Sequence, residues 1–272
     1  MTYSLSRDSE RQAGVPEGKV SQHSFHSEIF GGTHRDYWVY VPEQYDEAQP
    51  AALMVFQDGE AYVDDNGHFR VPVVLDNLID EGSLPPAIAL FINPGHSGKA
   101  PPDACWQADN RSYEYDSMTE KYSRFIVEEM LPELEKDYRI SRDPKSRAIG
   151  GMSSGGICAF TVAWQRPDQF HKVISHVGSF TDIRGGHNYP YYIRQWHKRE
   201  LKVFLQSGEG DLETQFGNWW LANQQMAAAL AWRQYDHRFV GGKGGHDGEH
   251  GGSILPDSLR WLFSDVPVAR KV

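Results

Sequence analysis

A serine with one glycine two residues before it and another two residues after it is the side chain in this sequence best suited to nucleophilic chemistry. Ser153 lies in the segment GMSSG at residues 151–155, which matches the pattern G-x-S-x-G. An apolar stretch precedes this segment, and a helix-compatible stretch, residues 157–164, follows it. A serine at such a strand–turn–helix apex has a strained backbone, so it needs small neighbours, and its hydroxyl stands clear of the sheet. The pattern predicts a nucleophile at Ser153, the alternative being an ordinary turn rich in glycine and serine.

A nucleophilic serine needs a general base, and the base needs a carboxylate that holds its tautomer. Two acidic residues, Glu209 and Asp211, follow the apolar stretch 201–206, where a strand is expected to end. We favour Asp211 as this carboxylate and keep Glu209 as the alternative.

Histidines in a glycine-rich segment, residues 241–252, are the candidates for the base. This segment follows the last predicted strand, where the chain order serine, carboxylate, histidine places the base. His246 is favoured over His250 because of its Gly-Gly-His setting. The two histidines are four residues apart, but the segment is too rich in glycine for a stable helix and lacks the pattern H-E-x-x-H, so we expect no metal site.

Apolar stretches that alternate with helix-compatible stretches predict an α/β fold, in which a mostly parallel sheet carries helices on both faces. Gly31 and Gly32 predict a turn within an opening antiparallel pair, and Pro132 is expected to kink or restart a helix. Residues 1–19 are expected to form an extended arm and residues 20–272 a single domain. The predicted strands are 20–25, 37–41, 51–56, 87–92, 148–149, 172–177, 201–206 and 238–240, and the predicted helices are 71–79, 122–134, 157–164, 221–232 and 255–263.

Composition limits the classes of partner. The 272-residue chain has a formal net charge of −10 and no run of Lys and Arg, which argues against nucleic acid. No stretch suits a signal peptide or a membrane span, so we expect a cytoplasmic protein without a membrane partner, a processed secreted form being the alternative. Cys105 and Cys158 do not make a disulfide framework and fit a reducing compartment. The oligomeric state is open, with a homodimer as one option.

Three tryptophans are candidates for contact with a substrate. Trp106 lies in a loop, residues 93–113, that is long enough to act as a lid or a binding loop, and it either lines a cleft or pins the loop. Trp219 and Trp220 could stack on a sugar or a phenolic ring, with core or lid packing as the alternative.

The motifs of this chain resemble the branch of the α/β-hydrolases that includes enterochelin esterases, feruloyl esterases and acetyl-xylan esterases. The resemblance spans roughly residues 20–265 and implies an α/β-hydrolase fold. We expect no cofactor. It rests on the segments VFQDG at 55–59, GGMSSGG at 150–156, LQSGEGD at 205–211, GGHD at 244–247 and ILPDSLRWL at 254–262.

The resemblance also implies roles for individual residues. It implies Ser153 as the nucleophile, His246 as the base and Asp211 as the partner of the base. It further implies an oxyanion hole made by the backbone N–H groups of Ser154 and Glu60. Glu60 follows a predicted buried strand at the carboxyl end, where open α/β sheets place their sites, although an ordinary Asp-Gly turn is the alternative interpretation there.

We therefore expect a serine carboxylic-ester hydrolase that acts on a small-molecule or carbohydrate ester, first of all a feruloyl- or acetyl-decorated carbohydrate. An enterochelin-type siderophore trilactone is the alternative substrate, and a cationic pocket would favour it because its ferric complex is anionic. A non-catalytic binding protein of the same fold is an alternative of another class. The cationic side chains that could form such a pocket are Arg111, Arg184, Arg194 and Lys243.

Overall fold

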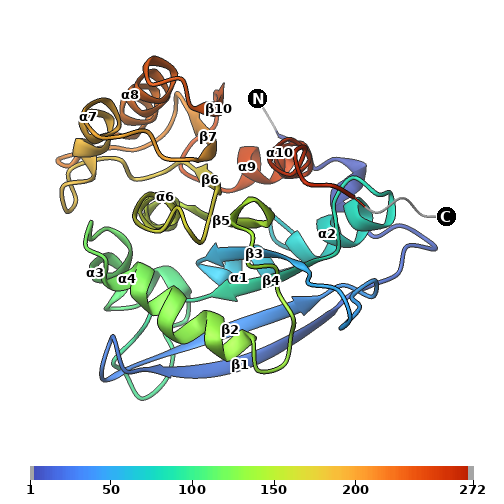
Figure 1. The fold of residues 1–272 in the computed structure, drawn as a ribbon. Helices are drawn as coiled ribbons and strands as arrows, with labels where there is room; N and C mark the ends of the chain where they lie inside the picture. Colours follow the sequence, from blue (N-terminus) through green and yellow to red (C-terminus); the bar gives the residue numbers. More distant parts are fainter. Residues whose placement is uncertain (1–2, 269–272) are drawn as a thin grey trace.

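The computed structural model describes residues 3–268 and centres them on an eight-stranded sheet (Figure 1). Its strands are β1 Lys19–Ser27, β2 Thr33–Val41, β3 Ala52–Gln57, β4 Ala87–Ile92, β5 Arg147–Met152, β6 Lys172–His176, β7 Lys202–Gly208 and β10 Asp236–Gly242. They lie in the order β1-β2-β4-β3-β5-β6-β7-β10, parallel from β4 onward, with β1 and β2 antiparallel at one edge. The predicted α/β fold with a mostly parallel sheet is confirmed. The first two residues of the predicted arm and the last four of the predicted domain lie outside the described residues.

The amino-acid composition of the strands accounts for their places in the sheet. β1 and β2 form the predicted antiparallel pair, and the turn between them contains Gly32 at a φ of +82°, in the region that favours glycine. β3 and β4 are buried at every position, as expected for apolar strands that are covered on both faces.

Helices cover the sheet in two layers. They include α2 Val71–Asp80, the π-helical segment η3 Phe125–Met130, α6 Ser154–Gln165, α8 Trp219–Trp232 and α10 Leu255–Leu262. Alternate residues of β3 contribute to different layers: Leu53 and Val55 join the core formed with η3, α6 and α8, whereas Met54 and Phe56 join the core formed with α2 and α10. None of the helices within residues 3–268 is long and apolar enough to cross a lipid bilayer.

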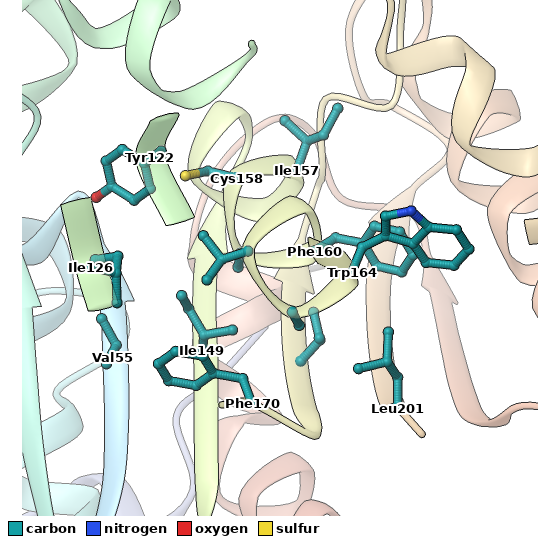
Figure 2. Packing of buried hydrophobic residues seen from close by; sticks show 14 of the residues in the cluster. Val55, Tyr122, Ile126, Ile149, Ile157, Cys158, Phe160, Trp164, Phe170 and Leu201 are labelled. Atoms are coloured by element: carbon teal, nitrogen blue, oxygen red, sulfur yellow. The ribbon is translucent and has the colours of Figure 1, made fainter. Parts of the chain in front are cut away.

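The first of these cores encloses α6, the helix that begins directly after Ser153. Every residue of α6 from Ser154 to Trp164 is buried, as expected of a helix that is surrounded on all sides. Figure 2 shows Phe160 of this helix in the same packed layer as Ile149 of β5 and Leu201. Because α6 is enclosed, its N-terminus is held at a fixed place over the sheet.

The predicted helix at 122–134 consists of three consecutive pieces. These are α4 Lys121–Arg124, the π-helical segment η3 and α5 Leu131–Leu134. Pro132 stands in the first turn of α5, where the missing N–H of proline removes no helical hydrogen bond. The backbone remains helical from α4 through η3 into α5, so the chain does not restart a helix at Pro132, and the change near the proline is the π-helical segment directly before it.

Short elements that the sequence did not predict follow the carboxyl ends of the strands. They are α1 Gly59–Val63, α3 Arg111–Tyr115, α7 Tyr189–Gln195, the hairpin of β8 Glu213–Thr214 and β9 Gly217–Asn218, and α9 Glu249–Ser253. Hydrophobic periodicity needs a longer window than these segments offer, so it could not reveal them.

The N-terminal arm packs against the domain. Arg11 forms ion pairs with Asp76 at 2.7 Å and with Asp65 at 2.6 Å. The Tyr3 hydroxyl accepts a hydrogen bond from the backbone N–H of Lys243 at 2.9 Å. The arm thus reaches the glycine-rich segment that carries the candidate base.

Candidate active site

Ser153 occupies a sharp turn between β5 and α6, and its backbone is strained there. Its φ of 57° and ψ of −123° are angles that residues other than glycine rarely adopt. Glycine is needed beside it, because a Cβ on Gly151 would lie 2.4 Å from the carbonyl carbon of Gly155. The glycine spacing in the sequence therefore has a steric cause, which is the close approach of the strand end to the start of the helix.

His246 links Ser153 to Asp211 through its two ring nitrogens. Nε2 lies 2.8 Å from Ser153 Oγ, and Nδ1 lies 2.6 Å from Asp211 Oδ1. An ionised carboxylate only accepts hydrogen bonds, so Nδ1 carries the proton and Nε2 accepts the hydroxyl hydrogen of Ser153. The structure thus brings together the three side chains that the sequence predicted as nucleophile, base and acid.

The two candidate acids have different environments. The side chain of Asp211 is fully buried, and it accepts hydrogen bonds from the Ser207 hydroxyl and from the backbone N–H of the next residue, both at 2.8 Å. The side chain of Glu209 is 50% exposed and forms an ion pair with Lys243. Asp211 is therefore the carboxylate in contact with His246, and Glu209 is not.

His250 has partners of its own. Its Nδ1 lies 3.1 Å from Nε2 of Gln206 on β7, and its ring stacks on Tyr3 with the centroids 4.1 Å apart. Burial lowers the pKa of His250, which favours the neutral ring. Within residues 3–268, no group of three or more His, Cys, Asp and Glu side chains is arranged to hold a metal ion. His246 and His250 thus contact different side chains.

A second contact reaches Ser153 Oγ from Ser179, a residue that the sequence analysis did not select. The two hydroxyl oxygens lie 3.2 Å apart, and Ser179 Oγ accepts a hydrogen bond from Trp219 Nε1 at 3.0 Å. The indole N–H can only donate, so Ser179 is the acceptor in that contact and its own hydroxyl hydrogen is available for Ser153 Oγ. The hydroxyl hydrogen of Ser153 is donated to His246. The signal for Ser179 was its place three residues after the end of β6, the strand beside β5.

The three tryptophans predicted as substrate-binding residues lie in different surroundings. Trp219 is 3% exposed, and its N–H is already used within the site. Trp220 packs on Phe239 of β10, with the ring centroids 5.5 Å apart. Trp106 is 62% exposed, so it does not pin the loop 93–113 by burial. Of the three, Trp106 alone presents most of its ring at the surface.

The two predicted oxyanion donors differ in what they contact. Within the part of the chain that the structure describes, the Ser154 N–H has no hydrogen-bond partner, as is usual in the first turn of a helix. The Glu60 N–H donates to the side-chain oxygen of Asn93 at 3.0 Å. The Glu60 N–H is thus engaged in this structure, because Asn93, the residue after β4, reaches the turn after β3, and its role as an oxyanion donor stays a prediction.

A buried ion pair supports the turn that carries Glu60. Asp58 has a left-handed backbone with a φ of 54°, and its carboxylate accepts two hydrogen bonds from Arg111, at 2.8 and 2.7 Å. A Cβ on Gly155 would lie 3.0 Å from Asp58 Oδ2, so the pair lies against the start of α6. This contact fixes the turn after β3 relative to Ser154.

Comparison with known proteins agrees with this architecture. Residues 27–261 match the family described as "Putative esterase". The iron(III) enterobactin esterase of Dickeya dadantii (strain 3937) is 26% identical over 258 residues, which are 86% of this chain and 53% of that relative. The corresponding protein of Escherichia coli O6:H1 is 25% identical over 86% of this chain and 54% of its own length. This chain thus spans about half the length of these curated relatives.

Solved structures share the fold. The enterobactin esterase FES from Shigella flexneri, determined in the presence of enterobactin, matches with a TM-score of 0.76 and 22% identity, over 94% of this chain and 62% of that one. The ferulic acid esterase AmCE1/Fae1A from Anaeromyces mucronatus matches with a TM-score of 0.74 and 17% identity, over 97% of this chain and 100% of that one. The fold is that of the α/β-hydrolases. Because the family match covers far more than half of the sequence, the chain belongs to this esterase family.

Proposed function

We propose that this protein is a serine carboxylic-ester hydrolase that works through an acyl-enzyme on Ser153. The observation that carries the proposal is the hydrogen-bonded series from Ser153 through His246 to Asp211, with contacts of 2.8 and 2.6 Å. Nucleophile, base and orienting carboxylate in hydrogen-bond contact are the arrangement that covalent catalysis by serine requires.

In the first half of the proposed reaction, Ser153 Oγ attacks the ester carbonyl while His246 Nε2 takes its proton. Asp211 holds the imidazole in the tautomer that leaves Nε2 unprotonated, and it stabilises the imidazolium that forms. His246 then gives the proton to the departing alcohol. In the second half, water attacks the acyl-enzyme by the same route, and Ser153 is released.

The developing oxyanion needs donors that lie in place before the reaction. The Ser154 N–H is the first donor, because no other described group uses it. The Glu60 N–H becomes the second donor when the oxyanion replaces the Asn93 oxygen that it now contacts. Loss of one such donor typically costs about 10²–10³-fold in kcat.

The test of the reaction is the variant Ser153→Ala, with Ser24→Ala on the exposed face of β1 as the matched control. We expect Ser153→Ala to lose hydrolysis of p-nitrophenyl acetate and labelling by a fluorophosphonate probe, and Ser24→Ala to keep both. A parent rate in Ser153→Ala would refute the assignment. A wild-type protein that is folded and takes no label would instead favour the non-catalytic binding protein.

For the substrate, we propose a feruloyl- or acetyl-type ester of a carbohydrate. Two of the four candidate cations support this choice over an anionic ferric siderophore, because Arg111 is paired with Asp58 and Lys243 with Glu209. The charge of these cations is compensated, so they offer less to an anion.

An enterochelin-type trilactone is the second candidate, because matching relatives carry the name iron(III) enterobactin esterase. A hydrolysis panel of methyl ferulate, acetylated xylan, p-nitrophenyl esters and enterobactin separates the candidates by kcat/KM. We expect the ferulate or acetyl esters to be the best substrates. A higher kcat/KM for enterobactin would reverse the order.

A further inference from the structure

Tyr3, in the N-terminal arm, contacts the chain on both sides of His246. Before His246, the Tyr3 hydroxyl accepts a hydrogen bond from the backbone N–H of Lys243 at 2.9 Å. After His246, the Tyr3 ring stacks on His250, with the ring centroids 4.1 Å apart and the planes at 8° to each other. One side chain thus joins the two ends of the loop 243–250, which carries the proposed base.

The middle of this loop has little support from the rest of the backbone. Among the residues that the structure describes, none forms a backbone–backbone hydrogen bond with residues 245–247. A segment with few backbone hydrogen bonds opens more easily than one that belongs to a strand or helix. The position of His246 therefore depends on how firmly the two ends of the loop are held.

Glycines at two positions of the segment make room for Tyr3. A Cβ on Gly242 would lie 2.2 Å from the Tyr3 hydroxyl oxygen, and a Cβ on Gly244 would lie 3.1 Å from Tyr3 Cε2. Neither glycine has a positive φ, so close packing and not backbone conformation favours glycine here. This part of the glycine-rich segment is thus shaped to receive the Tyr3 ring.

The backbone on which Tyr3 packs is also joined to the loop that carries Asp211. The Gly210 N–H donates a hydrogen bond to the Gly244 carbonyl at 3.1 Å. Asp211 directly follows Gly210, and His246 stands two residues after Gly244. Tyr3 therefore packs on the part of the chain that sets the position of the base relative to its carboxylate.

The arm that carries Tyr3 is anchored at other places. Asp8 pairs with Arg260 of α10 at 2.9 Å. Asn77 of α2 donates hydrogen bonds to the backbone carbonyls of Asp8 and Glu10, at 2.8 and 2.9 Å. Tyr3 is thus tethered to two helices that carry none of the proposed catalytic residues.

We infer that Tyr3 is a positioning residue, which holds both ends of the loop 243–250 and so keeps His246 between Ser153 and Asp211. The inference rests on the proposed esterase function and extends it to the N-terminal arm. Tyr3 acts through the backbone of the loop and through His250, and not by contact with the substrate.

The test compares Tyr3→Ala with Tyr45→Ala, which removes the same kinds of contact elsewhere. The Tyr45 hydroxyl accepts a hydrogen bond from the backbone N–H of Arg139 at 2.8 Å, and its ring packs edge-on against Tyr138 with the centroids 6.0 Å apart. Arg139 is bonded to Ala51, just before β3, so Tyr45 lies at the amino end of the strands and away from Ser153. Urea unfolding of both variants shows whether they lose similar stability.

We expect Tyr3→Ala to lower kcat for p-nitrophenyl acetate about 10- to 100-fold while KM stays within about twofold, because a misplacement of about 1 Å costs up to about 10²-fold in rate. Tyr3→Phe keeps the stacked ring and should stay within about threefold of the parental kcat. Tyr45→Ala should keep the parental kcat. The parental kcat in a folded Tyr3→Ala protein, or an equal loss in Tyr45→Ala, would overturn the inference.

Hydrogen exchange followed by mass spectrometry tests the contact without relying on the reaction. Backbone N–H groups of residues 243–248 should exchange about 2- to 10-fold faster in Tyr3→Ala, as expected for the loss of one hydrogen bond, and at the wild-type rate in Tyr45→Ala. Faster exchange in Tyr3→Ala, together with a wild-type protein that neither hydrolyses esters nor takes the fluorophosphonate label, would overturn the proposed reaction and leave the hold of Tyr3 on the loop standing. Unchanged exchange in Tyr3→Ala would overturn that hold.

Discussion

The hydroxyl of Ser179 should contribute to catalysis through Ser153, without touching the substrate. In the structure the Ser179 hydroxyl accepts a hydrogen bond from the Trp219 N–H at 3.0 Å and lies 3.2 Å from Ser153 Oγ. Ser153 Oγ in turn lies 2.8 Å from His246 Nε2. Trp219 therefore donates to Ser179, Ser179 donates to Ser153, and Ser153 donates to the base. A hydrogen donated to Ser153 Oγ orients its lone pairs and stabilises the negative charge that builds up there as the proton leaves.

The variant Ser179→Ala removes this contact and little volume. A neutral hydrogen bond contributes about 0.5–1.5 kcal/mol, which corresponds to about a 2- to 10-fold fall in kcat. KM should stay unchanged, because the lost interaction strengthens only in the transition state. The same variant leaves the buried Trp219 N–H without an acceptor, so the free energy of unfolding should fall by about 1–3 kcal/mol.

The assay is the steady-state hydrolysis of p-nitrophenyl acetate, with the acylation burst measured separately. Trp219→Phe is the matched variant, since it removes the donor to Ser179 and keeps the ring that packs beside His246. If the contacts act in series, the double variant is no slower than Ser179→Ala alone. A folded Ser179→Ala protein with the parent kcat and burst rate would refute this reasoning.

Three further predictions concern the acid, an ion pair at the amino end of β6 and the pH dependence of stability. Asp211→Asn should lower kcat by about 10³–10⁴-fold, because the amide favours the wrong tautomer of the base. Glu209→Gln should change kcat less than threefold, and an inactive Glu209→Gln protein would reverse the assignment of the acid. Lys172, whose side chain is 1% exposed, donates a hydrogen bond to Asp265 at 2.5 Å. Asp265→Asn should therefore lower the free energy of unfolding, measured in urea, by about 1–3 kcal/mol, and an unchanged value would mean that the pair does not stabilise the fold. Burial lowers the pKa of His176 from 6.5 to about 3, so between these pH values the ring binds a proton in the unfolded chain but not in the folded protein. The free energy of unfolding therefore falls by up to about 1.4 kcal/mol per pH unit as the pH drops from 6.5 toward 3. His176→Gln should lose this component and show a shallower decline between pH 6.5 and 4, and an equally steep decline would exclude His176 as its source.

Local pattern predicted those features whose cause is local. The strands β3 and β4 are apolar at nearly every position because both of their faces are covered, and this is visible in the sequence itself. The turn at Ser153 is also encoded locally, because the glycines at 151 and 155 exist to let strand and helix approach.

Features that depend on contacts between distant segments could not be predicted in this way. Glu209 and Asp211 are two residues apart in the same loop, and what separates them is that Lys243 from another loop pairs with Glu209. The Glu60 N–H is engaged by Asn93, which follows a different strand. Trp219 begins a helix, and nothing in its own neighbourhood shows that its indole N–H meets Ser179.

Each group around Ser153 is held at a second point, and this determines how the site should respond to change. Asp211 is held by the Ser207 hydroxyl, and the segment that carries His246 is held through the contact of His250 with Gln206. Ser153 itself is constrained by the strained turn and by Ser179. Groups that are fixed before the substrate arrives need no reorganisation during the reaction, which is how preorganised sites stabilise charge. Substitutions at these second points should therefore lower kcat more than they raise KM.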